Sequence, residues 1–378
     1  MMPATTRLFS MARTRGRSPS HRTAVSLHSH TLFSREGMMF IPHLASSIPL
    51  LKSLLSRKIA RFAASNGKRI DFSCMHWTPP VLPRAVLDQE VTQIHERLGM
   101  KALVSITDHD CIDGVMHLQV CNLSLEIPIS VEWSVPYEGA LVHLGVHNIP
   151  ADQAHGLLKE MQRYSAAPSA SRLKEILSAL HSVPQVLLML NHPFWDLHYD
   201  SPDRHARALA AFLRTNDSHI HALELNGYRS WSENRDVLSL AEELGKPAVS
   251  GGDRHGWQPN ALLNLTSAHS FADFAAEIRR DRLSQILILP EYLEPRALRA
   301  FTTIDEALRD YPRHPWGHQH WTDRVMVGID AEGRRPLSHF WQNGGPWWLR
   351  SALWAVRAAA HPRLRPVLRR ALTEEVIH

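Results

Sequence analysis

The sequence predicts an α/β fold built around a mostly parallel sheet, and two observations support this prediction. Short apolar runs bounded by Pro, Gly and Asn are typical of buried strands, and they occur at residues 25–27, 102–106, 127–131, 186–190, 222–225 and 248–250. Between these runs, apolar residues recur at helical spacing over residues 86–98, 157–164, 173–180, 206–213 and 237–244. Strands that alternate with helices favour a parallel sheet, because each helix returns the chain to the starting edge.

The first helical pattern illustrates the signal on which these helix predictions depend. Val86, Val91, Ile94 and Leu98 lie near one face of a helix, and Gly99 directly after them is typical of a helix end. The later patterns repeat this apolar spacing. We therefore expect amphipathic helices that cover a buried sheet.

Each predicted strand ends in residues that can carry chemistry. These are His28-Ser29-His30, Thr107-Asp108-His109-Asp110, Glu132, Asn191-His192-Pro193, Asn226-Gly227 and Asp253-Arg254-His255, in chain order. Because the carboxyl ends of parallel strands open on one face of such a fold, we expect these residues to gather there.

Composition excludes several classes of protein. The chain of 378 residues has 42 Lys and Arg against 37 Asp and Glu, a net charge of +5, which is weak support for nucleic-acid binding. Hydrophobic residues make up 44% and charged residues 21%, as in ordinary globular proteins. Histidine is the outlier, with 25 residues, which suits metal binding or proton transfer.

The cysteines and the apolar pattern indicate the cellular compartment in which we expect the protein. Cys74, Cys111 and Cys121 form no CxxC pair, which excludes a disulfide framework or a Cys-based zinc finger. No apolar stretch approaches the roughly 20 residues that span a bilayer. The Arg- and Ser-rich start lacks the apolar core of a secretory signal. We interpret residues 1–24 as a disordered basic tail, with an organelle-targeting segment as the alternative, and we expect a cytoplasmic protein.

Two segments depart from the alternating pattern. Residues 37–83 form an insertion, too long for a simple connection, and residues 292–378 form an extension of unknown role that we expect to be helical. The extension holds six of the 11 tryptophans: Trp316, Trp321, Trp341, Trp347, Trp348 and Trp354. Residues 347–372 mix Trp, Leu and Arg in a basic amphipathic pattern, which suits a membrane surface, a dimer contact or packing across the domain.

The strand-end residues suit a metal site. In His28-Ser29-His30 the two imidazoles are two positions apart on a strand, so both can reach one ion, and Asp253 and His255 repeat this spacing. Glu132 can bridge two cations through its two oxygens. Alternatively, an isolated HxH arises by chance, and Asp253 could simply cap a helix. The ordered recurrence at strand ends favours metal binding, and nitrogen and oxygen ligands suit Zn, Mn or Fe.

The ordered set of motifs resembles the PHP (polymerase and histidinol phosphatase) superfamily of metal-dependent phosphoesterases over residues 25–290. The resemblance rests on Ser26-Leu27-His28-Ser29-His30-Thr31, the unaltered Thr107-Asp108-His109-Asp110, Glu132, His143 in Val142-His143-Leu144-Gly145, His192-Pro193, and Asp253 with His255. It implies a distorted (β/α)7 barrel over residues 25–291 that holds two to three divalent ions.

The resemblance also implies ligand sets. One ion would take His28, His30, Glu132 and Asp253, and a second Glu132, His143 and His192. A third would take His109, His255 and an acid or histidine shortly after His30, for which Glu36 is the candidate, displaced by one residue from the family position. Ser26 stands where the family usually has Asp. A metal-bridged hydroxide would attack the phosphoester, with Asp108, His109 and His255 as catalytic candidates.

The predicted activity is hydrolysis of a small phosphorylated metabolite or nucleotide. Arg35, Arg229 and Arg254 are candidates to bind its phosphate, although a structural salt bridge is an equal alternative for each. A nuclease acting on nucleic acid, an amidohydrolase-like enzyme and a non-catalytic scaffold that binds a partner remain as alternatives.

Overall fold

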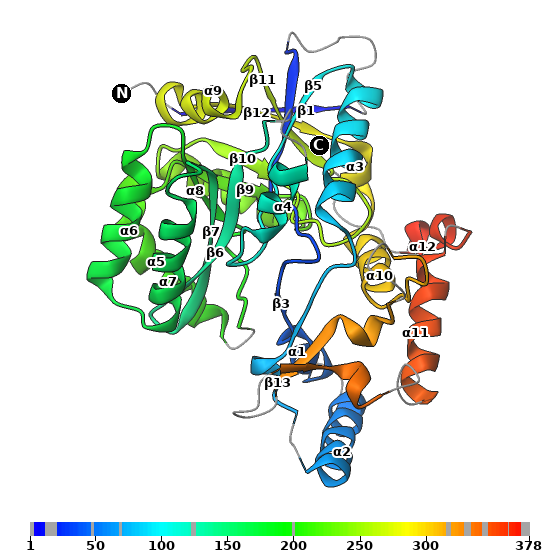
Figure 1. Ribbon diagram of the computed structural model, residues 1–378. Coiled ribbons are helices and arrows are strands. Elements are labelled where there is room, and N and C mark those ends of the chain that lie inside the picture. Colours follow the sequence, from blue (N-terminus) through cyan, green and yellow to red (C-terminus); the bar gives the residue numbers. More distant parts are fainter. Residues whose placement is uncertain are drawn as a thin grey trace.

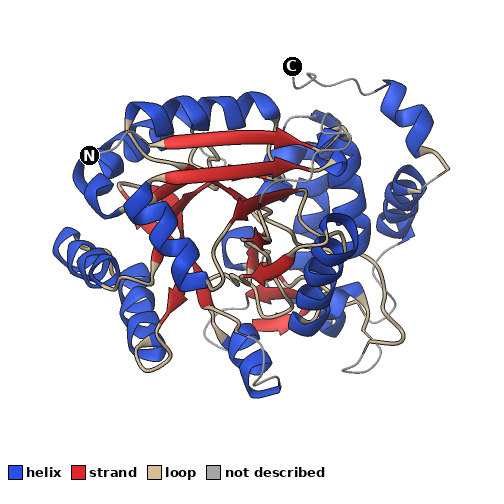
Figure 2. Cartoon of the chain, turned by 90° about the horizontal axis from the view of Figure 1, so that it is seen from above, coloured by secondary structure: helices blue, strands red, loops and turns tan. Residues whose placement is uncertain are grey.

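The computed structural model describes residues 4–11, 21–46, 49–67, 70–121, 126–198, 201–314, 319–328, 334–341, 347–361 and 363–371. The fold is mixed α/β, with three sheets among the described residues and helices around the outside of the strands (Figures 1 and 2). Among these residues, no helix combines the length and apolar character that a membrane span requires.

The first five-stranded sheet has the order β1-β12-β11-β2-β5. Its strands are β1 (Thr5–Ser10), β2 (Thr23–Ser26), β5 (Lys101–Val104), β11 (Leu262–Thr266) and β12 (Leu283–Ile288). β1 runs parallel to β12 and β2 runs parallel to β5, whereas β11 is antiparallel to both of its neighbours. The expectation of a disordered tail over residues 1–24 is wrong for β1, because residues 5–10 pair with β12 along its whole length.

The second five-stranded sheet has the order β10-β9-β8-β7-β6. Its strands are β6 (Ile129–Tyr137), β7 (Ala140–Ile149), β8 (Leu187–Asn191), β9 (Ala222–Asn226) and β10 (Ala248–Gly251). β6 and β7 form a hairpin whose turn residues, Glu138 and Gly139, have φ values of 47° and 78°. Two central residues with positive φ make the tight turn that suits the twist of a hairpin. β7 and β8 are also antiparallel, so the predicted mostly parallel sheet is wrong.

The two five-stranded sheets meet at two seams but do not form one continuous ladder. Isolated parallel bridges join Ser29 to Arg254 at one seam and His109 to Glu132 at the other. A closed, distorted (β/α)7 barrel is therefore not confirmed: the hydrogen-bonded strands are divided between separate sheets. Both seams lie at residues that the sequence singled out for chemistry.

Helices cover the outer faces, where they bury the outward side chains of the strands. The helices between the strands are α3 (Pro83–Leu98), α4 (Asp113–Cys121), α5 (Ala154–Ala166), α6 (Ala170–Ser182), α7 (Pro202–Asn216), α8 (Trp231–Glu243) and α9 (Phe271–Ala276). Gly99 ends α3 in the left-handed conformation (φ 64°), as its position in the sequence predicts. The largest core cluster joins Leu188 and Leu223 of the second sheet to helix residues such as Phe212.

Side chains that face the interior between the sheets change from apolar to polar toward the carboxyl ends of the strands. Alternate residues of a strand share one face. On β8, Met189 packs in the inner apolar cluster, whereas Asn191 reaches the carboxylate of Glu132. On β9, Ala222 packs in the same cluster and Glu224 bonds to His28. The inner apolar cluster thus lies beneath a layer of polar side chains at the carboxyl ends of the strands.

The insertion and the extension form one small lobe around a shared core. Its sheet has the order β14-β13-β4-β3, from β3 (Glu36–Gly37), β4 (His76–Trp77), β13 (Val325–Gly328) and β14 (Arg334–Pro336). Met38 and Met75 of the insertion pack with Trp321, Val327 and Leu353 of the extension. The helices of these two segments are α1 (Phe40–Ser46), α2 (Pro49–Asn66), α10 (Arg296–Ala307), α11 (Trp347–Ala360) and α12 (Arg365–Ala371), seen in the lower and right-hand parts of Figure 1. Trp316 lies outside the described residues.

Candidate metal centre

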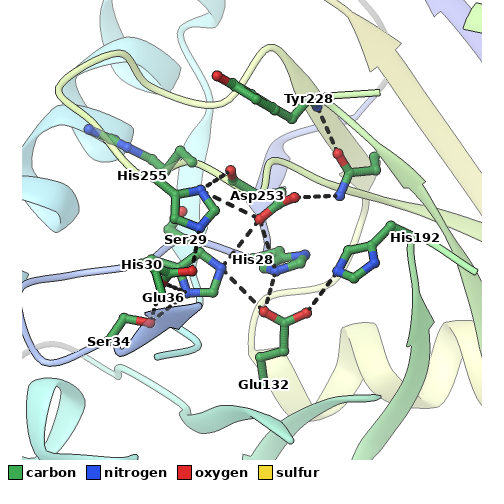
Figure 3. A network of polar contacts seen from close by, with 12 residues as sticks. His28, Ser29, His30, Ser34, Glu36, Glu132, His192, Tyr228, Asp253 and His255 are labelled. Carbon is green, nitrogen blue, oxygen red and sulfur yellow. Dashed lines mark hydrogen bonds and ion pairs between the residues drawn. The ribbon is translucent and has the colours of Figure 1, made fainter. Parts of the chain in front are cut away.

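A cluster of imidazoles and carboxylates lies where the two large sheets meet the small lobe. Glu132, on β6, is fully buried and occupies its middle. Its Oε2 atom lies 2.9 Å from Nε2 of His28, 3.3 Å from Nε2 of His30 and 3.4 Å from Nε2 of His109. Its Oε1 atom lies 3.1 Å from Nδ1 of His143 and 3.1 Å from Nε2 of His192. Glu132 therefore touches both sides of the cluster (Figure 3).

Asp253 approaches the same imidazoles from the loop after β10. Its Oδ1 atom lies 3.4 Å from Nε2 of His30 and 3.6 Å from Nε2 of His28. Its other oxygen accepts a hydrogen bond of 3.2 Å from the side-chain amide of Asn226. His28, His30, Glu132 and Asp253 thus form one group of nitrogen and oxygen atoms around a common point.

Glu36 forms a second focus of the cluster. Its Oε2 atom lies 2.9 Å from Nε2 of His255 and 3.2 Å from Nε2 of His109, and its Oε1 accepts a 2.6 Å hydrogen bond from Ser34. Glu36 belongs to β3 of the small lobe, whose neighbouring strand places the Trp77 ring 5.9 Å from that of His255. The small lobe therefore supplies part of the site.

Three of the imidazoles have their Nδ1 hydrogen committed outside the cluster. Nδ1 of His28 donates to Glu224 at 2.5 Å, and Nδ1 of His255 donates to the carbonyl of Asp253 at 2.8 Å. Ser34 donates its hydroxyl hydrogen to Glu36, so it accepts from Nδ1 of His30 at 3.1 Å. In the neutral form of each ring, these bonds place the hydrogen on Nδ1 and leave the Nε2 lone pair pointing at carboxylate oxygens. Two acceptors that face one another require a cation between them, either a proton on the ring or a metal ion.

The pKa values of these groups also show that the cluster favours a positive charge between imidazole and carboxylate. Burial by itself lowers the pKa of His109 and His255, but nearby carboxylates outweigh it and raise these values to about 10 and about 9. Glu36 is the largest carboxylate influence on both. The imidazoles in turn outweigh burial at Glu132 and Asp253 and hold the pKa of each carboxyl below its usual range. Burial lowers the pKa of His143 to about 4, which leaves a neutral nitrogen at pH 7.

The backbone is strained at this cluster. His28, His192 and Asp253 have φ values of 62°, 26° and 52°, in a region that L-residues seldom adopt, although Asp and His adopt it more often than most. Asp110, beside His109, has a φ of 51°. Such strain persists only where the surrounding structure enforces it, and it concentrates at functional sites.

Sequence reasoning missed Glu224, which is fully buried on β9. Besides the bond to His28, its Oε2 accepts from the backbone N–H of His192 at 2.8 Å and from the amide of Asn226 at 3.0 Å. Asn191 stands out in the sequence only as part of a motif, yet its amide donates to Glu132 at 2.9 Å. The signal for Glu224 is a single carboxylate inside the apolar run 222–225.

The structure places two predicted site residues elsewhere. Asp108, expected to be catalytic, accepts from the backbone N–H and the hydroxyl of Thr31 at 2.6 and 2.8 Å, so it holds the loop after His30. Burial raises its pKa to about 6, against the effect of these two hydrogen bonds. Arg254, expected to bind phosphate, points into the core, where it donates to Glu90 at 2.6 Å and to the carbonyl of Gly256.

The Arg254–Glu90 pair also contacts the serine of the first motif. Ser26 donates to Oε2 of Glu90 at 2.9 Å, and Asn260 donates to the Ser26 hydroxyl at 2.8 Å. Glu90, from α3, thus brings a carboxylate to the buried position beside Ser26.

Arg229 and Arg35 remain candidates for binding phosphate. Arg229 makes a forked pair with Glu233, both bonds being 2.7 Å. Its guanidinium lies 4.6 Å from the Trp195 ring centre, which is 5.1 Å from that of His192. Arg35 is exposed beside the buried Glu36. Both cations therefore lie near cluster residues, and their role toward a substrate stays a prediction.

Comparison with known proteins gives no family assignment. No protein-family profile matches the chain, and no curated protein sequence matches it. Among solved structures, PsfC from Pseudomonas syringae is 16% identical, with a TM-score of 0.41 over 76% of this chain and 98% of its own. A protein titled as a putative metal-dependent phosphoesterase, from Bifidobacterium adolescentis, is 14% identical, with a TM-score of 0.34 over 70% and 98%. An amidohydrolase from Chromobacterium violaceum is 16% identical, with a TM-score of 0.34 over 48% and 84%. Likenesses this distant carry no functional conclusion, so the function must follow from the site itself.

Proposed function

We propose that this chain is a metal-dependent phosphoesterase whose cluster holds two to three divalent ions. The ligand sets are His28, His30, Glu132 and Asp253 for one ion, Glu132, His143 and His192 for a second, and Glu36, His109 and His255 for a third. Three groups that could hold an ion occur here: His28, His30 and Glu132; His109, Glu132 and His143; and His30, Glu36, His109 and His255. Imidazole and carboxylate ligands suit Mn, Fe or Zn.

One observation carries this proposal: the ring nitrogens of several imidazoles converge on buried carboxylates. Nε2 of His30 and Nδ1 of His143 are buried and lack a hydrogen-bond partner among the described residues. A buried atom of this kind costs free energy unless something binds it. A divalent ion would satisfy the nitrogens and balance the carboxylates at once, which protons can do only at some of these positions.

The protein's own groups would have distinct tasks in hydrolysis. Divalent ions, when bound, supply Lewis-acid stabilisation of the charge that develops on phosphoryl oxygens and lower the pKa of water. His109 and His255 lie beside the part of the cluster where the small lobe meets the sheets. They would bind the third ion together with Glu36, and in a site with two ions they could hold or move a proton instead. Glu224, Ser34 and the carbonyl of Asp253 orient the imidazoles, and Arg35 or Arg229 would attract the anionic substrate.

A small phosphorylated metabolite or nucleotide is the substrate class we favour. A nuclease is the second candidate, because the same ions would cleave phosphodiesters. A non-catalytic scaffold would need a degenerate site, and the buried, mutually oriented ligand atoms argue against one. We expect a cytoplasmic protein.

Metal removal tests the function. Protein purified without a His tag should contain about two to three equivalents of Mn, Fe or Zn by plasma mass spectrometry. It should release phosphate from p-nitrophenyl phosphate or a panel of phosphorylated metabolites, lose this activity on chelation, and regain it when an ion is restored. Activity that survives complete chelation would overturn the proposal. If the protein held its full complement of ions but released phosphate from no monoester or diester, the site would bind metal but would not be a phosphoesterase site.

Glu224 should orient His28 without touching an ion. All three of its partners donate to it, so Glu224→Gln would turn a side-chain N–H₂ toward a donor and disturb the ring of His28. We expect affinity for divalent ions, measured by calorimetric titration of metal-free protein, to fall about 10- to 100-fold. Glu277→Gln is the control, because Glu277 bonds to Thr266, away from the cluster. Equal affinities in the two variants would show that Glu224 has no orienting role.

A further inference from the structure

The helix α11 presents a solvent-exposed face that carries two tryptophans. Trp347 and Trp354 are 78% and 71% exposed, and Arg350 and Ser351 between them are exposed as well. These four residues, here called the Trp face, share one side of the helix because their spacing is i, i+3, i+4 and i+7. Leu353, on the other side, is 6% exposed and packs in the core of the small lobe. The indoles are therefore not needed to hold α11 in place.

The charge carried by α11 and α12 themselves has one sign, although Arg357 pairs with Asp305, and Arg365 and Arg369 pair with Glu294. Residues 347–371 contain six arginines (Arg350, Arg357, Arg363, Arg365, Arg369 and Arg370) and neither Asp nor Glu. Arg350 and Arg363 are exposed and have no carboxylate partner among the residues that the structure describes. Exposed aliphatic side chains also follow α11 in the chain, with Leu364 45% and Val367 66% exposed.

We propose that the Trp face and the neighbouring residues 363–367 bind the surface of an anionic lipid bilayer. Indoles settle at the boundary between headgroups and acyl chains, and arginines beside them pair with lipid phosphates. α11 has 14 residues and would lie in the plane of the surface, since spanning takes about 20. Figure 1 shows α11 and α12 at the outer edge of the molecule, where a flat surface can reach them.

Two other occupants fit this surface less well. A twofold contact between copies of the chain would bring arginines of one face against the same arginines of the other. A single-stranded nucleic acid would stack on the indoles and pair with the arginines. It would leave Leu364 and Val367 without a suitable partner, because bases stack on flat rings. Lipid is the occupant that uses the aromatic, aliphatic and cationic groups together.

Vesicle sedimentation tests the proposal on the full chain. Protein should sediment with vesicles of phosphatidylcholine containing about 30% phosphatidylglycerol, should do so far less with pure phosphatidylcholine, and should be released by salt. The Trp347→Ser/Trp354→Ser variant should bind the anionic vesicles about tenfold or more weakly. Val120→Ser is the matched control, since Val120 is also 78% exposed but lies on α4. Circular dichroism and metal content check that each variant folds.

Several results would overturn the proposal. The wild-type chain could fail to bind anionic vesicles, or the double variant could bind them as tightly as the Val120→Ser control. A dimer that the double variant dissociates, without vesicle binding by the wild type, would identify the face as a contact between copies. Tighter binding to a single-stranded oligonucleotide than to vesicles, lost in the double variant, would identify a nucleic-acid surface.

Discussion

Glu132→Gln should abolish metal binding at two of the proposed positions and lower phosphate release by roughly 10³-fold or more, about 4 kcal/mol of transition-state stabilisation. The reason is the position of its carboxylate, within 3.4 Å of nitrogens from five imidazoles. An amide of the same shape removes the bridging charge, and its N–H₂ group cannot bind an ion and would donate to imidazole lone pairs that an ion needs. Metal content by plasma mass spectrometry and phosphate release from p-nitrophenyl phosphate would be measured on the same samples.

The control for this prediction is Glu277→Gln, a half-buried carboxylate outside the cluster. Circular dichroism would show that Glu132→Gln retains its fold, which removal of a buried negative charge near cationic groups could disturb. A folded Glu132→Gln protein that keeps its full complement of ions would contradict the bridging role. One that loses its ions and still hydrolyses phosphoesters would contradict the proposed mechanism as a whole.

The sequence predicted which residues would lie together because strand ends are placed by simple rules. Apolar runs define buried strands, and the residues that follow each run emerge at one edge. His28, His109, Glu132, His192 and Asp253 meet in the structure for this reason. Their roles as ligands stay predictions. Glu36 is harder to predict, since it enters from a two-residue strand of the small lobe and no local pattern marks that strand.

Pairing between distant segments escaped prediction. Thr5, at the start of β1, pairs with Leu283 of β12, and nothing in a basic stretch signals so distant a partner. The same holds for the small lobe, whose core joins Met38 to Trp321. An alternating apolar pattern shows that a strand is buried, but it does not show which strand pairs with it or in which direction. The antiparallel pairing of β11 with β2 and β12 could not be predicted for this reason.

The direction of its side chain explains why Arg254 forms a buried ion pair and does not face the cluster. Asp253 and His255 point into the cluster, whereas the residue between them points to the other side, although the left-handed φ of 52° at Asp253 shows that the segment is not a regular strand. Arg254 there meets Glu90, which is fully buried, and is itself 5% exposed. The sequence contained the alternation but not the partner, since Glu90 lies on a helix 164 residues away.

Arg254→Met should therefore destabilise the protein by about 3–5 kcal/mol, because it leaves the Glu90 carboxylate buried without a counter-charge. The interaction at stake is a 2.6 Å bond between groups that are 4% and 0% exposed. Thermal and urea unfolding of the metal-free proteins would measure the loss. If Arg254 instead bound substrate phosphate, the variant would retain its stability and show a raised KM, which would contradict the structural role.

The double variant Arg254→Met/Glu90→Gln separates an unpaired charge from lost packing. The amide that replaces the Glu90 carboxylate would be neutral, and its oxygen could still accept a hydrogen bond, either from Ser26 or from the backbone N–H of Asn260. Because no charge is then left uncompensated, we expect the double variant to recover most of the stability that the single substitution removes. A double variant as unstable as Arg254→Met would show that packing around the guanidinium, and the bond to the Gly256 carbonyl, account for the loss.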